Sequence, residues 1–474
     1  MWQPILPILV AAVAVTALFF NAKSSPTNST PFANYVQAAS VLTPQPVRTS
    51  THVRPWSSVF SDGTPLVFRS LLRDWTAVNR WSPSYLGKKW KRMKVHTTEQ
   101  DTTRMLSKVQ PFGREKQLQW SASYDEKVVA GSEFFNPNPT NSSDRMYLFA
   151  PVEELPPALQ KDFQGFNLAQ LGTPGNIDSA GFWSGRPTIA SPLHYDAAHN
   201  VYCQIFGYKR FILFPHNVSQ LLYSHSRLHP STRSSFINLR HVDPSRFSKF
   251  KQALDNNTLY SSEVVLGPGD VLYIPPYTWH RASVVGTDFS MSLAVYSTST
   301  IMHQYDVLKS YPVPIDPTWL WNRKVAALKT YVCALASMWD DDDDDPAVTD
   351  VSVCSARIAN LLEQRYAPLS NDPHKTNIIQ GWDTFIKVGQ RHFLWSTAKV
   401  KVPPEVELYL VQHAATLKKK LTKRSSKEEG EEDIARDVWT TETLSLIEDV
   451  VNYVVGSKYV EPFFRWVAGD LMLW

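Results

Sequence analysis

Two short motifs, far apart in the chain, hold the side chains of this 474-residue sequence that are best suited to chemistry. In the first, Ser191-Pro-Leu-His-Tyr-Asp, His194 and Asp196 are two positions apart, so on a β-strand both side chains lie on the same face. The second motif, residues 267–280, ends in His280. A sheet that curls into a barrel can bring His280 to the same interior point. Two imidazoles and one carboxylate on one side of a metal leave other positions open, as in non-haem Fe(II) oxygenases. A His-X-Asp pattern also arises by chance, so its surroundings decide its interpretation.

Strand-like segments surround both motifs. Residues 200–206 and 209–214 predict a strand and its return strand, with Gly207-Tyr208 as a tight turn between them. Residues 271–274 and 289–296 predict two further strands near the second motif. The motifs therefore lie on a predicted β scaffold, which favours a metal site over a chance pattern.

Lys209 has a special position on the predicted return strand, because it shares one face with Phe211 and Leu213. If that face is interior, Lys209 is a buried cation that needs an anionic partner, which a bound dicarboxylate would supply. The alternative is a lysine that extends to solvent from the end of a hairpin. His199, five residues after His194, points to the opposite face of a regular strand and is not expected to be a ligand.

Residues 191–215 and 267–280 together resemble the JmjC (cupin-like) family of Fe(II)- and 2-oxoglutarate-dependent oxygenases. The resemblance is greatest to the hydroxylase branch typified by the hypoxia-inducible-factor asparaginyl hydroxylase, whose entry segment is similar to residues 64–75 and 81–86. It implies a mainly β fold: a double-stranded β-helix (a cupin or jelly-roll barrel) with flanking helices and a helical C-terminal unit.

The resemblance implies that His194, Asp196 and His280 bind Fe(II), with 2-oxoglutarate and O₂ as cosubstrates, and it implies no catalytic residue beyond this metal centre. The implied activity is a hydroxylase of a protein side chain that couples decarboxylation of 2-oxoglutarate to C–H oxidation. A JmjC lysine demethylase remains an alternative, although no chromatin-reading or zinc module is recognisable in the sequence. Two further alternatives are a metal cupin that is an isomerase or binding protein, and an inactive scaffold. The complete triad and Lys209 disfavour both.

The resemblance assigns four side chains to 2-oxoglutarate, and one of them, Lys209, is also favoured by its interior position on the predicted strand. Lys209 is similar to the lysine that holds the distal carboxylate, Ser191 to a hydroxyl residue that assists it, and Tyr147 to a tyrosine that reaches the same carboxylate. Asn200 matches an asparagine near the metal-binding end of the cosubstrate. Ser292 departs from the branch, which has an amide residue at that position on the last strand, so that contact is in doubt.

Composition and length describe an ordinary globular protein of more than one unit, with 43% hydrophobic residues and a net charge of +4. No long basic arm is present, so nucleic acid is not an expected partner. The predicted organisation is a signal peptide or signal anchor at 1–24, a Ser/Thr/Pro-rich linker at 25–55, the oxygenase domain at 56–300 and a helical region at 301–474. A protein or peptide substrate is the expected partner, and the resemblance implies a homodimer through the C-terminal helices.

The N-terminal segment predicts entry into the secretory pathway. Residues 5–20 are an apolar run, intermediate in length between a secretory signal and a membrane span of about 20 residues. A cleaved signal and an uncleaved membrane anchor both remain open, and a cytoplasmic protein is the alternative. Asn-X-Ser/Thr sequons add mild support, and they begin at Asn28, Asn141, Asn217 and Asn256. Cys333 and Cys354 are expected to pair if the compartment is oxidising, and Cys203 is expected in the core.

Several other segments have predicted structures. A helix is expected to end at Trp75, and Ser82 is the expected N-cap of a second helix. The insert at 216–259 either rims the mouth of the site or is a solvated loop. The acidic run at 340–345 is expected to be a solvated loop, since it lacks the spacing of an EF-hand calcium site. The C-terminal helices are predicted from Asp316-Pro317 onward and at 355–366, 405–423, 441–455 and 461–473, with an exposed linker at 418–433.

Overall fold

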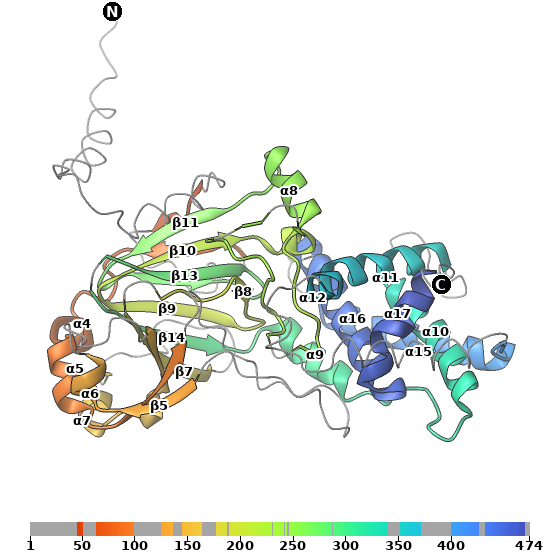
Figure 1. Ribbon diagram of the computed structural model, residues 1–474, viewed down its shortest axis with the longest axis horizontal. Coiled ribbons are helices and arrows are strands. Elements are labelled where there is room, and N and C mark those ends of the chain that lie inside the picture. The colour runs from red at the N-terminus through yellow and green to blue at the C-terminus, as the bar shows by residue number, and fades with distance from the viewer. Residues whose placement is uncertain are drawn as a thin grey trace, which may run out of the picture.

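The computed structural model describes two β-sheets that face each other, with helices on the outer face of one sheet and a helical unit at the C-terminal side (Figure 1). The described residues are 45–50, 63–98, 125–135, 145–163, 177–186, 189–229, 231–240, 242–243, 246–286, 288–339, 351–370, 400–425 and 432–469.

The sheets differ in size and connection. In spatial order, the smaller sheet consists of β1 (Gln45–Pro46), β11 (Ser262–Leu266), β10 (Tyr208–Phe214), β13 (Trp279–Val285) and β8 (His194–Tyr195). The larger sheet consists of β2 (Arg48–Ser50), β3 (Leu66–Phe68), β12 (Val271–Ile274), β9 (His199–Phe206), β14 (Ser290–Ser297), β7 (Ile177–Gly185), β6 (Arg145–Pro151), β4 (Met93–Thr98) and β5 (Asp125–Val129). From β7 to β14 the chain passes back and forth between the two sheets, as in a jelly roll. The predicted mainly β barrel with flanking helices is confirmed.

The turn at Gly207 is a corner between the two sheets. The predicted strands on either side of it are confirmed, but the expected pairing of the two as a hairpin is wrong. β9 pairs with β12 and β14 in the larger sheet, whereas β10 pairs with β11 and β13 in the smaller one. Gly207 has φ +67°, and a Cβ on it would overlap the carbonyl oxygen of Phe289. Glycine is therefore required by both the backbone conformation and the close approach of β14.

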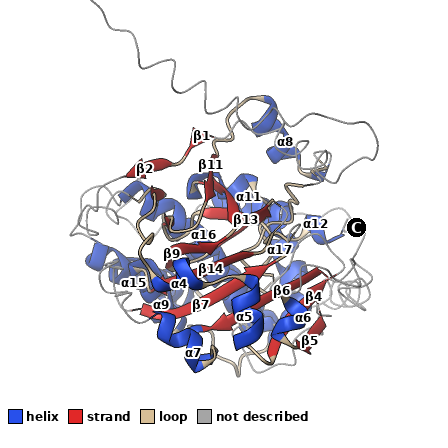
Figure 2. Ribbon diagram, turned by 90° about the vertical axis from the view of Figure 1, so that its left-hand side faces the viewer, coloured by secondary structure: helices blue, strands red, loops and turns tan. Residues whose placement is uncertain are grey.

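Apolar side chains from both sheets meet inside the barrel. Phe211 and Leu213 of β10 pack there with residues of the larger sheet such as Leu272 and Ala294, and all four are buried. The other face of the larger sheet packs against short helices, which lie in front of its strands in Figure 2. These are α4 (Thr76–Arg80), α5 (Pro83–Lys89), α6 (Gly131–Phe134), η1 (Val152–Glu154), α7 (Pro157–Gln160) and η2 (Lys161–Phe163).

The first of these helices starts where a helix was predicted to end. Trp75 is the N-cap of α4, because the preceding residues wrap around a buried carboxylate instead of forming a helix. The main-chain nitrogen of Ser70 donates to Asp270 Oδ1 at 2.9 Å, and Arg69 Nη1 donates to Asp270 Oδ2 at 2.6 Å. Ser82 caps α5 as predicted, with its hydroxyl accepting a hydrogen bond from the main-chain nitrogen of Tyr85.

The C-terminal unit is helical and has a hydrophobic core of its own. Its helices are α9 (Thr300–Lys309), α10 (Trp321–Ala336), α11 (Val351–Arg365), α12 (Ala367–Ser370), α15 (Pro404–Ser425), α16 (Glu432–Val455), η6 (Ser457–Tyr459) and α17 (Val460–Ala468). Several boundaries differ from the prediction, among them the start of α16, which is at Glu432 instead of Thr441. Asp316 closes a turn by accepting from the nitrogen and hydroxyl of Thr318, so α10 starts only at Trp321. The predicted linker at 418–433 is partly helical, since α15 continues through Ser425.

A disulfide joins Cys333 of α10 to Cys354 of α11, as predicted for an oxidising compartment. The two residues are 21 positions apart, so the closed loop stabilises the folded chain by about 3 kcal/mol through the lost freedom of the unfolded chain. Cys203 is a free, buried cysteine of the barrel, also as predicted.

Other sequence features fall outside the described residues. The apolar run at 5–20, most of the predicted linker, the acidic run at 340–345 and the sequons at Asn28 and Asn141 are among them. Within the described part of the chain, none of the helices has both the length and the apolar character needed to cross a membrane. Asn217 and Asn256 are exposed.

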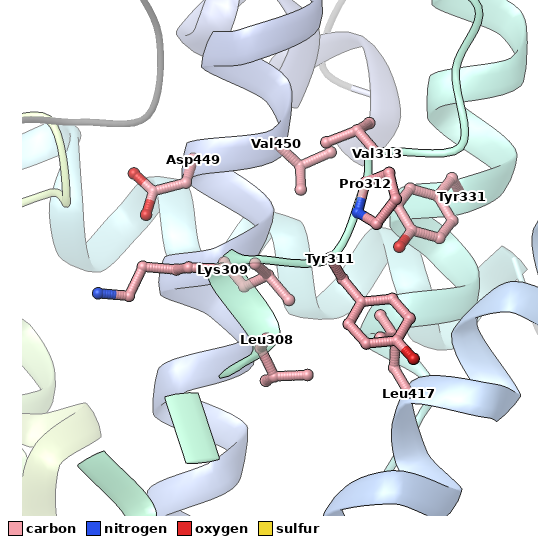
Figure 3. Close-up of a pocket in the computed structure, with 10 residues that line it drawn as sticks. Leu308, Lys309, Tyr311, Pro312, Val313, Tyr331, Leu417, Asp449 and Val450 are labelled. Carbon is pink, nitrogen blue, oxygen red and sulfur yellow. The ribbon is translucent and has the colours of Figure 1, made fainter. Parts of the chain in front are cut away.

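A mostly apolar pocket lies within the helical unit (Figure 3). It is lined by side chains of α9, α10, α15 and α16, with Tyr311 and Pro312 from the connection between α9 and α10. Lys309 and Asp449 are its charged lining residues, and Figure 3 shows both on the same side of it. None of the predicted site residues lines this pocket, so it is not the candidate site.

Candidate metal centre

The pairing of β8 with β13 brings the two motifs together. His194 and His280 are directly opposite each other in the antiparallel register, and their rings are 4.3 Å apart between centroids. Asp196 follows two residues after His194 and faces the same side, with its Oδ2 3.7 Å from His280 Nε2. One ligand atom from each of the three side chains lies within 4.8 Å of the others. No other such group of His, Cys, Asp or Glu is found among the described residues.

Main-chain carbonyls orient both imidazoles. Nδ1 of His194 lies 2.9 Å from the carbonyl oxygen of Pro192, and Nδ1 of His280 lies 3.0 Å from that of Thr278. A carbonyl can only accept, so each Nδ1 carries a proton, and in a neutral imidazole the lone pair is then on Nε2. A metal-ligating histidine needs this tautomer, and the hydrogen bond at Nδ1 fixes the orientation of its ring. The Nε2 atoms are therefore free to bind a cation.

The electrostatic setting also suits a cation. Burial, and secondarily the neighbouring His194, lower the pKa of His280 to about 4, so its imidazole is neutral near pH 7. Asn200 Nδ2 donates to Asp196 Oδ2 at 3.3 Å and so helps to orient the only anion of the group. The Asp196 side chain keeps 29% of its surface exposed, which leaves the centre reachable from one side.

Lys209 is buried inside the barrel, with 2% of its surface exposed, as the interior alternative predicted. The solvent-directed alternative is wrong. Its Nζ donates to the hydroxyl of Tyr202 at 2.6 Å, and none of the described carboxylates forms an ion pair with it. Burial lowers the pKa of Lys209 to about 7. Val284, its partner on β13, is four positions beyond His280, so Lys209 is displaced by about 13 Å along the strand from the histidines.

The remaining predicted cosubstrate residues lie on strands that border this interior. Tyr147 of β6 is buried, and burial followed by the neighbouring Tyr202 raises its pKa well above the ordinary value. The hydroxyl of Ser191 accepts from the main-chain nitrogen of Ala282 at 2.9 Å, so β13 engages it instead of the lysine. Asn200 Oδ1 is buried and has no hydrogen-bond partner in the described part of the chain.

Ser292 bonds to the side-chain amide of Gln204 on the neighbouring strand β9. Ser292 Oγ donates to Gln204 Oε1 at 2.9 Å, and Gln204 is fully buried. Gln204 Nε2 in turn donates to Ser290 Oγ at 3.1 Å and to the Gly207 carbonyl at 3.0 Å. The polar network of the interior thus reaches the corner between the sheets.

Two tyrosines of this interior were not predicted. Tyr202 bonds to Lys209, and the pKa of Tyr296 is raised well above its ordinary value by burial and then by the nearby Asp196. The signal for Tyr202 was present, since it lies two positions after Asn200 on a predicted strand and shares its face. His199 falls outside the group, as predicted, and its Nδ1 shares a hydrogen bond of 2.8 Å with the hydroxyl of Tyr273.

The insert at 216–259 forms a second neighbour for β8 and is not a solvated loop. Ser234 makes a bridge to His194, and the nitrogen of Ser235 donates to the Leu193 carbonyl at 2.8 Å. The insert also contains η4 (His216–Leu221) and α8 (Ser248–Asp255). Buried apolar residues such as Phe236 and Phe250 pack it against the outside of the smaller sheet.

The donor set fits a bound Fe(II) and an anionic cosubstrate. Two free imidazole nitrogens and one carboxylate are the ligands of a non-haem iron site. The buried Lys209 bonds only to the Tyr202 hydroxyl and has no carboxylate partner among the described residues. Burying an ammonium group without an anionic partner is costly, so a bound carboxylate is the simplest explanation of its presence.

Comparison with known proteins identifies the family. A family model described as a cupin-like domain matches residues 53–301, just over half of the chain. The chain belongs to the cupin-like domain family. The match includes both halves of the candidate metal centre and all four predicted cosubstrate residues of this cupin-like domain.

Several curated proteins are similar to parts of the chain. The "Jumonji C domain-containing protein 5" of Drosophila melanogaster is 33% identical over 149 residues, which cover 31% of this chain and 34% of that protein. The "Lysine-specific demethylase JMJ30" of Arabidopsis thaliana is 30% identical over 118 residues, 25% of this chain and 26% of that protein. The "tRNA wybutosine-synthesizing protein 4" of Gibberella zeae is 38% identical over 168 residues, 32% of this chain and 15% of that protein. The chain thus spans about a third or less of the length of these relatives.

Proposed function

We propose that this protein is an Fe(II)- and 2-oxoglutarate-dependent oxygenase of the JmjC type, and more narrowly a hydroxylase of a protein or peptide side chain. His194, Asp196 and His280 would hold the iron, and no further catalytic residue is required. The oxygenase unit corresponds to residues 56–300, with the helical region at 301–474 packed beside it. The observation that carries the proposal is the convergence of the three potential ligands in one barrel that also buries Lys209.

The residues of the barrel have distinct roles in this proposal. Iron, 2-oxoglutarate and O₂ would together supply the oxidising chemistry, in which decarboxylation of the oxo acid drives oxidation of a C–H bond. Lys209 and the hydroxyls of Tyr202 and Tyr147 bind the far carboxylate of the dicarboxylate. Asn200 orients Asp196 through its side-chain amide nitrogen. The apolar walls of the barrel exclude water from the reacting centre.

The hydroxylase branch typified by the asparaginyl hydroxylase is the finer part of the proposal. It is supported by the resemblance of residues 64–75 and 81–86 and by an amide, Gln204, beside Ser292.

A second candidate is removal of an N-methyl group, because one relative is named a lysine-specific demethylase. The two reactions differ in product, since only demethylation releases formaldehyde. A screen of peptides with Fe(II) and 2-oxoglutarate, read by succinate and by the mass of the peptide, tests both. The proposal fails if no 2-oxoglutarate is consumed with or without peptide.

The pH dependence of cosubstrate binding follows from Lys209. With a pKa of about 7, the lysine carries a charge below pH 7 and loses it above. A bound carboxylate would raise this pKa and keep the lysine protonated. Binding therefore takes up a proton above pH 7. The dissociation constant of 2-oxoglutarate is expected to be flat below pH 7 and to rise by up to about tenfold per pH unit above it.

Isothermal titration of the metal-loaded protein at several pH values, in buffers of different ionisation heat, measures this uptake directly. Lys209→Met is the control and should show no proton uptake and a flat profile. A wild-type profile as flat as that of the variant would contradict the role of Lys209.

We infer that the chain enters the secretory pathway, where it either loses its N-terminal apolar segment or stays anchored by it. The disulfide between Cys333 and Cys354 supports an oxidising compartment. Expression in a eukaryotic cell is expected to give a protein whose gel mobility increases after glycosidase treatment, because Asn217 and Asn256 are exposed sequons. The double variant Asn217→Gln/Asn256→Gln should shift less. A wild-type protein that glycosidase leaves unshifted would favour a cytoplasmic location instead.

A further inference from the structure

The helical unit contains two hollows of very different size. The pocket in Figure 3 has a volume of about 20 Å³, which is room for about one water molecule, so it does not suit a larger ligand. Val313 lines this pocket and also a second hollow, an open groove of about 410 Å³. The volume of the groove is within the range of ligand sites, which is roughly 300–1,000 Å³. The groove is therefore the better candidate for a binding site.

The groove lies between the connection from α9 to α10 and the start of α15, which lies beside α10 in Figure 1. Its walls are mainly apolar or aromatic, with Val313, Trp319, Val406 and Tyr409 among them. Tyr409 keeps 54% of its surface exposed. An exposed aromatic side chain at a groove is typical of an interaction surface, because such rings are enriched in protein interfaces.

Two carboxylates line the groove, and none of its described lining residues is a cation. Asp316 Oδ1 accepts from the main-chain nitrogen of Thr318 at 2.8 Å and from its hydroxyl at 2.7 Å. These two bonds lower the pKa of Asp316, so its carboxylate is ionised near pH 7. Glu405 is exposed, and its carboxylate forms no hydrogen bond or ion pair with the described part of the chain. In a chain with a net charge of +4, the groove is therefore a local site of negative charge.

Two cations near the groove have other contacts. The guanidinium of Arg323 lies over the Trp319 ring, 4.4 Å from its centroid, and Lys324 Nζ donates to the carbonyl of Pro317 at 3.1 Å. Both charges lie close enough to Asp316 to lower its pKa slightly further, so they also weaken its attraction for a ligand. The Tyr409 ring has no such cation over it among the described residues. Glu405 and Tyr409 are thus the lining residues with the most freedom to bind a ligand.

We propose that this groove binds a basic segment of another polypeptide, with an arginine side chain against Tyr409 and Glu405 and an adjoining apolar side chain against Val313 and Val406. An arginine suits this lining, because its guanidinium stacks on aromatic rings and pairs with carboxylates, while its aliphatic part packs on apolar walls. Binding there does not depend on the proposed oxygenase activity, since the groove contains none of the candidate metal ligands or cosubstrate residues.

The test measures binding of a fluorescently labelled peptide of alternating arginine and leucine to the full-length protein, by fluorescence anisotropy. A peptide of alternating glutamate and leucine is the control for charge. Glu405→Gln removes the proposed ligand charge, and Glu407→Gln is its matched control. Glu407 is also exposed in the first turn of α15, where it has the same favourable interaction with the helix dipole, but it does not line the groove.

A second pair of variants tests the aromatic wall. Tyr409→Ala removes the ring, and Leu408→Ala is the matched control, because Leu408 is 53% exposed but does not line the groove. Tyr409→Phe keeps the ring and should retain binding. All these side chains are exposed, so the variants are expected to fold, and thermal unfolding checks this.

Wild-type protein is expected to bind the arginine peptide, to bind it less tightly as salt is added, and not to bind the glutamate peptide. Glu405→Gln is expected to weaken binding by about threefold and Tyr409→Ala by about five- to tenfold. Glu407→Gln, Leu408→Ala and Tyr409→Phe should leave the dissociation constant within about 1.5-fold of wild type.

Two results of the peptide titrations would overturn the inference. One is an equal effect of Glu405→Gln and Glu407→Gln, because the peptide would then respond only to the general charge of α15. The other is a wild-type protein that binds neither peptide or binds both equally. Sedimentation velocity tests the competing occupant, a second copy of the chain. If wild type is a dimer that Tyr409→Ala converts to a monomer, the groove holds a second copy and the inference is wrong.

Discussion

Asp196→Ala is expected to abolish metal binding and 2-oxoglutarate turnover while the barrel stays folded. Asp196 supplies the only anion of the group, so its loss leaves two neutral imidazoles to hold a dication. Loss of a residue that only hydrogen-bonds to a metal ligand weakens metal affinity by about 10–100-fold, so loss of the anionic ligand itself is expected to weaken it by more than about a hundredfold. Calorimetric titration with Mn(II) or Co(II), alongside thermal unfolding, measures both effects.

Asp162→Ala is the matched control for Asp196→Ala. Asp162 is also a carboxylate in the same unit, but it bonds to Arg80, Trp81 and Tyr85 outside the barrel interior. The Asp162→Ala variant is expected to lower the stability of the fold and to leave metal affinity unchanged, the reverse of the result expected for Asp196→Ala. Near wild-type turnover by Asp196→Ala under trace iron would show that the metal assignment is wrong.

Lys209→Met is expected to raise the dissociation constant of 2-oxoglutarate by about ten- to a hundredfold at a pH just below 7, with metal binding nearly unchanged. A buried charge-assisted contact contributes about 1.5–3 kcal/mol, and methionine keeps the length of the side chain while removing its charge. Lys209→Arg should be milder, although a planar guanidinium does not replace a point charge freely. Calorimetric titration of the metal-loaded protein gives both constants.

Arg210→Met is the control on the adjacent residue of the same strand. Arg210 points to the other face of β10 and forms two hydrogen bonds with Glu263, each of 2.6 Å. Removing its charge should leave the 2-oxoglutarate constant within about twofold of wild type. If the two variants bind 2-oxoglutarate equally well, Lys209 does not hold the cosubstrate.

The convergence of the candidate ligands could be anticipated from the sequence, but its geometry could not. Because side chains alternate between the two faces of a strand, the sequence predicts that His194 and Asp196 share a face and that Lys209 can point into the interior. The structure shows both arrangements. The register that sets His194 opposite His280 depends on the pairing of β8 with β13, which local sequence does not specify. The same limit explains the misassigned corner at Gly207. A tight turn with a left-handed glycine can connect two strands of one hairpin or two strands in different sheets. Which connection forms depends on the distant strands that pair with β9 and β10.

The insert was difficult to interpret for a different reason. Its serines, arginines and histidines have the composition of a solvated loop, yet Arg227 is 6% exposed. Its partner Asp449 lies 222 positions further along the chain. A buried charge can be recognised only when its partner is known, and no local pattern connects these two residues.

Anaerobic titration of the purified protein with Fe(II) and then 2-oxoglutarate tests the central claim most directly. An oxo acid chelated to Fe(II) gives a weak visible charge-transfer band, which an isomerase, a binding cupin or an inactive scaffold would not produce. The account predicts this band in wild type, its absence in Asp196→Ala, and its appearance only at higher 2-oxoglutarate concentration in Lys209→Met. A folded wild-type protein that binds Fe(II) but shows no band at saturating 2-oxoglutarate would contradict the account.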